Sequence, residues 1–144
     1  IQAVANATVP QITIVMGGSF GAGNYGMCGR GFGPHFIFAW PNSRTAVMGG
    51  EQAAKVMSVI TREKWNKEGR PVGEQEEFML NALEQQIIGK FDEDGHAFAA
   101  SARLFDDGLI DPRDTRRVLA LTLSICREAP LRTTRPNSFG VSRF

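Results

Sequence analysis

The amino-acid sequence predicts an α/β layered fold, because short apolar strands alternate with longer helical patterns along the chain. Three observations support this prediction. A β-branched run at 11–16 precedes a glycine-rich turn, two further short apolar runs follow at 36–40 and 45–48, and an amphipathic helical pattern covers 50–64. These patterns do not determine the order of the strands in the sheet.

The first predicted element is a short helix that ends before Pro10. Ile1, Val4 and Ala5 recur at helical spacing, and the chain begins within this pattern without an initiating methionine. We therefore expect a further portion of the protein to precede Ile1. The next run, 12–16, is of the kind found in buried parallel strands.

The second predicted helix follows the two short strands at 36–40 and 45–48, which a turn at 41–43 separates. Four apolar side chains recur within 50–64 at positions i, i+3, i+4 and i+7, and we expect this stripe to face the core. The stripe consists of Ala53, Val56, Met57 and Ile60.

Two more helices are predicted in the second half of the chain. Residues 74–89 begin with three glutamates, which suit the positive end of a helix dipole. Asp111, Pro112 and Asp114 combine a capping residue, a proline at the first helical position and an acid in the first turn, so another helix begins there. Residues 130–144 contain arginines and prolines but no acids, and we expect an extended C-terminal arm.

Composition narrows the range of functions. A chain of 144 residues with 42% hydrophobic content can bury one core, so we expect residues 1–144 to form one domain or part of one. The net charge of +1 gives no general reason to expect nucleic acid as a partner. Its two cysteines are far apart, which fits a reducing compartment and neither a disulfide framework nor a zinc site. No apolar run is long enough for a membrane span.

The most informative segment is the glycine-rich turn at 17–29, which holds six glycines in thirteen residues. It follows a predicted strand and is expected to open a helix. The first amides of a helix have no intrahelical partner and point outward with the positive end of the dipole. The turn is therefore predicted to bind an anion or a developing oxyanion.

The same glycines could serve a different purpose. The string 21–26 matches G-x-G-x-x-G, but the dinucleotide fold also needs an acid about 20 residues further on, and 38–48 contains none. A triphosphate-binding loop needs a lysine, and none occurs before Lys55. The glycines could also serve only close packing of a helix on a strand.

Five motifs stand out along the chain: GGSFGAGNYGMCGR at 17–30, WPN at 40–42, VMGGEQAA at 47–54, SARLFDDGLIDP at 101–112 and DTRR at 114–117. Together they resemble the carboxyltransferase (β) subunits of biotin-dependent acyl-CoA carboxylases, in the methylcrotonoyl-CoA and geranyl-CoA carboxylase branch. The resemblance is weakest at 62–98 and in the tail, and the family's subunit is several times longer, so its N-terminal domain is expected to be missing.

The resemblance implies a crotonase-like fold built from repeated ββα units, in which carboxybiotin meets an acyl-CoA enolate across a subunit interface. It implies that the backbone amides of Ala22 and Gly23 donate hydrogen bonds to the ureido oxygen of biotin, as an oxyanion hole does. Because biotin itself can then remove the substrate proton, the chain need not supply a general base. Residues expected to line the cofactor site are Gly21, Asn24, Tyr25, Gly49 and Gly50.

The titratable side chains outside this turn favour structural roles. His35 and His96 have no obvious nucleophile beside them, and we expect both to be structural or exposed to solvent. We expect Cys28 to be a packed thiol, although its place in the turn would also suit a nucleophile. The acids at 92–94 and 106–107 are expected to form a turn and a helix cap, not a metal site.

Arginines in the second half of the chain form a basic group, Arg103, Arg113, Arg116 and Arg117. Such a group could meet a CoA phosphate, but we assign it first to salt bridges at an interface.

The implied partners are a biotin carboxylase and biotin carrier α subunit, further copies of the chain, and an acyl-CoA substrate. The rival interpretations are a crotonase-like hydratase or decarboxylase and a non-catalytic fragment that is stable only inside an oligomer. The resemblance fits a bacterial cytoplasm or, in a eukaryote, the mitochondrial matrix.

Overall fold

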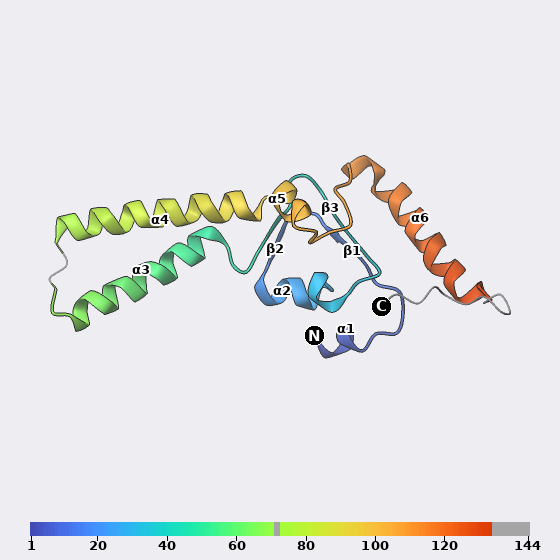
Figure 1. The fold of residues 1–144 in the computed structure, drawn as a ribbon, viewed down its shortest axis with the longest axis horizontal. Helices are drawn as coiled ribbons and strands as arrows, with labels where there is room; N and C mark the ends of the chain where they lie inside the picture. Colours follow the sequence, from blue (N-terminus) through green and yellow to red (C-terminus); the bar gives the residue numbers. More distant parts are fainter. Residues whose placement is uncertain (71–72, 134–144) are drawn as a thin grey trace, which may run out of the picture.

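The computed structural model describes residues 1–70 and 73–133, and it confirms an α/β architecture (Figure 1). Its elements in chain order are α1 (Gln2–Ala5), β1 (Ile12–Val15), β2 (Gly18–Phe20), α2 (Gly21–Gly26), η1 (Arg30–Phe32), β3 (Phe36–Ala39), β4 (Arg44–Ala46), α3 (Gly50–Lys67), α4 (Glu74–Gly95), α5 (Ala97–Ala102), η2 (Pro112–Asp114), α6 (Thr115–Glu128) and η3 (Ala129–Leu131).

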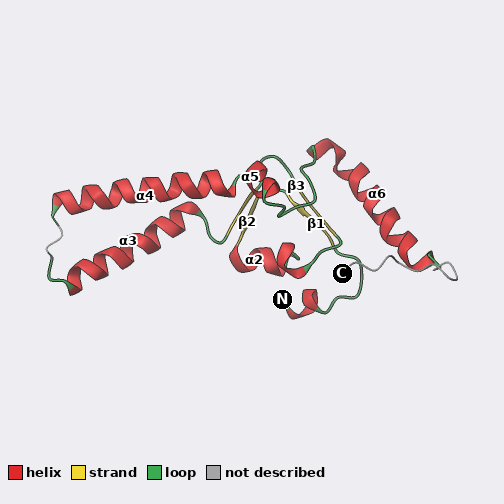
Figure 2. Ribbon diagram, viewed as in Figure 1, coloured by secondary structure: helices red, strands yellow, loops and turns green. Residues whose placement is uncertain are grey.

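Two consecutive ββα units form the centre of the molecule, β1-β2-α2 and β3-β4-α3. Each strand of the first unit pairs in parallel with its counterpart in the second, so that β1 pairs with β3 and β2 with β4. The pairs are in register from Ile12 opposite Phe36 and from Gly18 opposite Arg44. Figure 2 shows these short strands in yellow between the helices. Stacked ββα units are what the resemblance implied.

Local sequence explains three of the four strands. β1 is a β-branched run, ITIV, and β3 alternates half-buried phenylalanines with the buried Ile37 and Ala39. β4 overlaps the predicted run at 45–48. β2, with the sequence GSF, was not predicted, and it forms because the β4 backbone pairs with it.

The core around the strands consists of small side chains. Ala39, Ala54, Ala97 and Ala100 are all at most 4% exposed. Small side chains allow close approach of α5 to β4 and to the end of α4.

Helices α3 and α4 form a long hairpin that extends away from the strands (Figure 1). Leu80 is 2% exposed between them. The prediction that the stripe on α3 faces the core is correct for Ala53 but wrong for the other three side chains, because most of α3 lies beyond the strands. Their exposed fractions are 45% for Val56, 43% for Met57 and 53% for Ile60.

Helix α4 is longer than the sequence predicted. It continues through Gly89 to Gly95, although an interior glycine costs about 1 kcal/mol relative to alanine. Contacts of α4 with α3 and β4 offset this cost. The acids at 92–94, which the predicted end near residue 89 left outside the helix, therefore lie in its last turns.

Helix α6 starts where the sequence predicted. The Asp111 carboxylate accepts a hydrogen bond from the Arg113 N–H at 2.9 Å, Pro112–Asp114 form a 3₁₀ turn, and α6 follows. Beyond α6, Ala129–Leu131 form another 3₁₀ turn. Since 134–144 lie outside the described residues, the extended arm at 130–144 remains a prediction.

Candidate functional site

The glycine-rich turn leads from β2 directly into α2. Gly21, the first residue of α2, has φ of +52°, a conformation that side chains rarely adopt. A Cβ there would also lie 2.9 Å from the backbone oxygen of Val47. Only glycine fits this position, so the contact between the two ββα units explains Gly21 without any ligand.

Helix α2 presents its first N–H groups to the outside. Phe20 precedes the helix and its side chain makes no capping hydrogen bond. The N–H groups of Ala22 and Gly23 lie in the first turn, where no acceptor exists four residues back within the helix. Both residues are exposed. The local geometry thus provides two neighbouring donors on an accessible surface.

The remainder of the turn is held by contacts with Asn24. Its side-chain amide donates to Ser19 Oγ at 2.9 Å, and its backbone oxygen accepts from the Gly29 N–H at 2.7 Å. A Cβ on Gly29 would collide with the Asn24 side chain. Close packing against Asn24 therefore explains why residue 29 is a glycine.

Tyr25 is also packed within the turn. Its ring meets Phe32 edge to face at 5.6 Å, and a Cβ on Gly31 would lie 2.7 Å from the Tyr25 ring. Four glycines of this region, Gly18, Gly21, Gly29 and Gly31, are thus explained by contacts inside the chain. Gly17, Gly23 and Gly26 are not, because an added Cβ at each would have no described atom within 4 Å.

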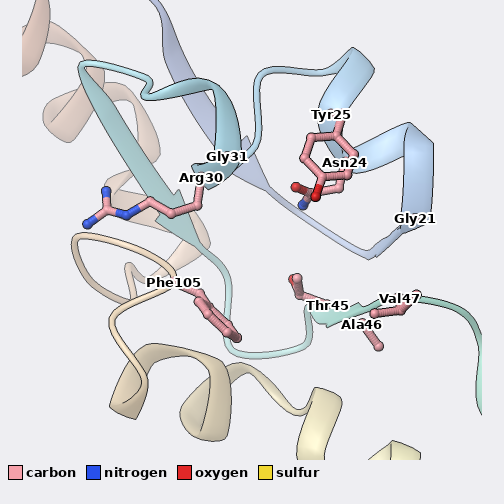
Figure 3. Close-up of a pocket in the computed structure, with 9 residues that line it drawn as sticks. All are labelled: Gly21, Asn24, Tyr25, Arg30, Gly31, Thr45, Ala46, Val47 and Phe105. Atoms are coloured by element: carbon pink, nitrogen blue, oxygen red, sulfur yellow. The ribbon is translucent and has the colours of Figure 1, made fainter.

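A cavity of about 320 Å³ opens beside the turn, between α2 and β4 (Figure 3). In Figure 3, Asn24 and Tyr25 approach it from the α2 side, and Thr45 and Val47 lie opposite. The cavity is lined by Gly21, Asn24, Tyr25, Arg30, Gly31, Thr45, Ala46, Val47 and Phe105. Three of the predicted site residues therefore meet at one cavity, while Ala22 and Gly23 lie outside this lining.

Arg30 and Phe105 were not predicted as site residues. Arg30 Nη1 lies 3.1 Å from Asp107 Oδ1, and Asp107 Oδ2 accepts the N–H of Ile37 at 2.8 Å. This contact fixes Arg30 at the cavity and joins it to β3. Arg30 directly follows the glycine turn, which was a usable signal, whereas Phe105 lies far along the chain and had none.

Gly49 and Gly50 are not brought to this cavity. Gly49 caps α3, as the strand-to-helix prediction implied. A Cβ on Gly50 would lie 3.2 Å from the backbone of Ile88 and 3.3 Å from Phe91 Cβ. The small size of Gly50 thus serves the packing of α3 against α4.

The histidines and Cys28 occupy structural positions. His35 Nδ1 accepts from the Gln11 N–H at 3.3 Å, and His96 Nδ1 accepts from the Phe98 N–H at 3.3 Å at the start of α5. Cys28 is 6% exposed, as expected of a packed thiol.

Two of the four arginines in the basic group, Arg103 and Arg113, form ion pairs within the described part of the chain. Asp106 is buried and accepts from the Ser101 hydroxyl at 2.8 Å. Arg103 lies 2.6 Å from Asp94 and its hydrogen bond lowers the pKa of that carboxyl. Arg113 pairs with Asp111 at 2.7 Å. No group of three acids, histidines or cysteines in the described part of the chain could hold a metal ion.

The dinucleotide alternative does not fit this geometry. The string that matches G-x-G-x-x-G is α2 itself, a helix of six residues, and not a loop ahead of a long helix. Within residues 1–70 and 73–133, no helix has the length and apolar character required to cross a membrane.

Comparison with known proteins identifies the family. The model of the carboxyl transferase domain matches residues 1–139. The chain is 48% identical over its full length to the methylcrotonoyl-CoA carboxylase beta chain of Dictyostelium discoideum. It is also 48% identical, over 91% of its length, to the biotin-dependent 3-methylcrotonyl-coenzyme A carboxylase beta1 subunit of Mycobacterium tuberculosis. In each case it covers 24% of the relative.

Solved structures agree with this assignment. The geranyl-CoA carboxylase beta subunit of P. aeruginosa matches 99% of the chain with a TM-score of 0.84 and 55% identity, and the chain covers 26% of it. The transcarboxylase 12S structure, described as a hexamer assembly, matches 98% of the chain with a TM-score of 0.68 and 32% identity, and the chain covers 24% of it. The predicted crotonase-like carboxyltransferase fold is confirmed. The chain spans about a quarter of these relatives and belongs to the carboxyl transferase family.

Proposed function

We propose that the protein containing this chain is the carboxyltransferase component of a biotin-dependent acyl-CoA carboxylase. Its substrate would be a branched unsaturated acyl-CoA, either 3-methylcrotonoyl-CoA or geranyl-CoA. The observation that carries this proposal is the combination of 48% identity to methylcrotonoyl-CoA carboxylase beta chains with 55% identity to the geranyl-CoA carboxylase beta subunit. This pair of relatives defines the branch and leaves the choice of acyl chain to experiment.

The described residues suit biotin, a neutral ring system that accepts hydrogen bonds at its ureido oxygen. When bound, biotin would supply the carboxyl group and leave negative charge growing on that oxygen. Ala22 and Gly23 offer two outward N–H groups, and the space beside Gly17, Gly23 and Gly26 is open. The neighbouring cavity has a mostly apolar lining. The two N–H donors and the open space beside them therefore fit biotin.

The role proposed for this chain is to hold the two N–H donors in place before the reaction. Donors fixed in advance stabilise developing charge more than mobile ones, because no reorganisation occurs as the charge appears. Gly21 serves this purpose through its contact with Val47. Asn24 and Tyr25 would form the wall between the donors and the cavity, and Gly49 and Gly50 would support the turn ahead of α3.

The proposed partners follow from the relatives. A biotin carboxylase and biotin carrier α subunit would deliver the cofactor, and further copies of the protein would complete the active site at a subunit interface. The location would be a bacterial cytoplasm or a mitochondrial matrix, the two settings suggested by a mycobacterial relative and by beta chains named as mitochondrial.

The experiment replaces the N–H groups without touching side chains that could react. The full-length subunit, assembled with its biotin-carrying partner, is prepared with Ala22→Pro or with Gly23→Pro. Since proline lacks the N–H, each change should lower carboxyl transfer to the preferred acyl-CoA about 100-fold or more. Circular dichroism and size-exclusion chromatography establish that the variants fold and assemble.

A matched control makes the same change elsewhere. Gln75 lies in the first turn of α4, where its N–H also lacks an intrahelical acceptor. Gln75→Pro should leave transfer unchanged. Full activity in folded Ala22→Pro and Gly23→Pro would refute the amide assignment, and failure of the wild type on both acyl-CoAs would refute the substrate branch.

A further inference from the structure

One hydrogen bond closes a small ring around the proposed donors. Ser19 lies in β2 and Asn24 lies in α2, and the Asn24 side-chain amide donates to Ser19 Oγ at 2.9 Å. The residues between them are Phe20, Gly21, Ala22 and Gly23. The bond therefore joins β2, which precedes Ala22 and Gly23, to Asn24, which follows them.

Both ends of this ring are fixed to the rest of the molecule. Ser19 lies opposite Thr45 in the pair formed by β2 and β4. The backbone oxygen of Asn24 accepts the N–H of Gly29 at 2.7 Å, and Gly29 packs so closely on the Asn24 side chain that no Cβ would fit. The amide of Asn24 has little freedom to turn away from Ser19.

We propose that Ser19 and Asn24 are positioning residues for carboxyl transfer, which fix the direction of the Ala22 and Gly23 N–H groups through their hydrogen bond. This inference rests on the proposed function. It changes the role expected of Asn24, which acts through Ser19 and the backbone, and it adds Ser19, for which the sequence had suggested no role. Neither side chain needs to touch biotin for this role.

Physical reasoning sets the expected size of the effect. The first turn of α2 has no side-chain cap, so the ring is the nearest side-chain constraint on the two donors. Misplacing a catalytic group by about 1 Å can lower turnover about 100-fold. Loss of one bond in a ring that keeps its other contacts should displace the donors less than that.

The test is Ser19→Ala in the full-length subunit, assembled with its biotin-carrying partner and assayed with methylcrotonoyl-CoA and geranyl-CoA. We expect kcat to fall about 10-fold or more, with little change in KM for the acyl-CoA or in Tm. Ser19→Thr, which keeps the hydroxyl, should restore kcat. The double variant Ser19→Ala/Asn24→Ala should be no slower than the slower single variant, because both changes remove the same bond.

Thr13 provides a matched control on the same turn. Its hydroxyl donates to the backbone oxygen of Cys28 at 2.9 Å, beyond the ring and after α2. Thr13→Val removes a part-buried hydrogen bond of equal length and should leave kcat near that of the wild type.

The outcomes separate this inference from the proposed function. If the wild type transfers carboxyl groups and Ser19→Ala is equally fast, the positioning role is wrong and the proposed function stands. The role is also wrong if Ser19→Ala lowers Tm and raises KM together and Ser19→Thr does not restore kcat, since the hydroxyl is then only structural. A wild type that carboxylates neither acyl-CoA overturns both proposals.

Discussion

The glycine-rich turn is held by contacts within this chain, whereas the α3–α4 hairpin is held by them only in part. In the turn, hydrogen bonds from Asn24 and close contacts at Gly21 and Gly29 fix the backbone from within the chain. In the hairpin, Leu80 is buried but Phe78 and Met79 are 75% and 64% exposed. Contacts within the chain thus fix the turn, whereas the hairpin exposes large apolar side chains.

This difference shows which properties depend on short stretches of sequence. The partners of the turn all lie within 13–47, so its geometry needs little from the remainder of the protein. In the hairpin, by contrast, Phe78 and Met79 stay mostly exposed, although they line a cavity together with Thr61 and Trp65 of α3.

The largest expected effect comes from breaking the turn at its most constrained residue. Gly21→Ala places a Cβ 2.9 Å from the Val47 oxygen and forces alanine to φ near +52°. The conformation alone costs about 1–2 kcal/mol. Because the donors follow immediately, carboxyl transfer by the full-length enzyme should fall about 100-fold or more.

A control separates backbone strain from the loss of the site. Gly69 also has positive φ, at +68°, but a Cβ there would meet nothing described within 4 Å. Gly69→Ala should lower stability by about 1 kcal/mol and leave transfer unchanged. Equal activities of the two alanine variants would mean that the constraint at Gly21 is unrelated to the reaction.

A smaller effect, on stability alone, distinguishes a buried side chain of the hairpin from an exposed one. Leu80→Ala removes a side chain that is 2% exposed and should lower the free energy of unfolding by about 2–4 kcal/mol. Phe78→Ala, at a side chain 75% exposed, should change it by about 0.5 kcal/mol or less. Urea denaturation of the full-length subunit measures both values.

The same pair of variants tests the contrast between turn and hairpin. If Phe78→Ala destabilises the assembled protein as strongly as Leu80→Ala does, another part of the assembly covers Phe78, and the hairpin is complete only there. If Phe78→Ala is neutral, the Phe78 side chain stays exposed to solvent.

The fold was predictable where a short run of sequence carries its own preference. β1 and β3 follow from β-branched and aromatic residues, and the start of α6 follows from Asp111 and Pro112. β2 was missed because GSF has weak strand preference and depends on pairing with β4. Burial of the α3 stripe was wrong because periodicity defines a face but not what lies against it.

The candidate site was predictable only in part, for a similar reason. The turn itself is one continuous segment, so Gly21, Asn24 and Tyr25 could be grouped from sequence. Phe105 reaches the same cavity through tertiary structure alone. The hydrogen bond between Ser19 and Asn24 also needed coordinates, because the spacing of two polar residues does not reveal which side chains meet.

The smallest expected effect concerns the contact between Asp111 and Arg113. It is local, like the contacts of the turn, but exposed to solvent. Hydrogen bonds from the Arg113 side chain, and then from its backbone N–H, lower the pKa of Asp111 from 3.8 to about 2. Because this pKa is lowered on folding, the ionised carboxylate stabilises the fold above pH 4, and this stabilisation is lost as the pH falls from about 4 to about 2.

Hydrogen exchange, followed by mass spectrometry in the full-length subunit, should show the start of α6 losing protection over this range. Asp111→Asn keeps a capping oxygen but does not titrate, so its protection relative to the rest of α6 should not change with pH. Parallel behaviour of the two proteins would show that the exposed ion pair with Arg113 does not stabilise the start of α6.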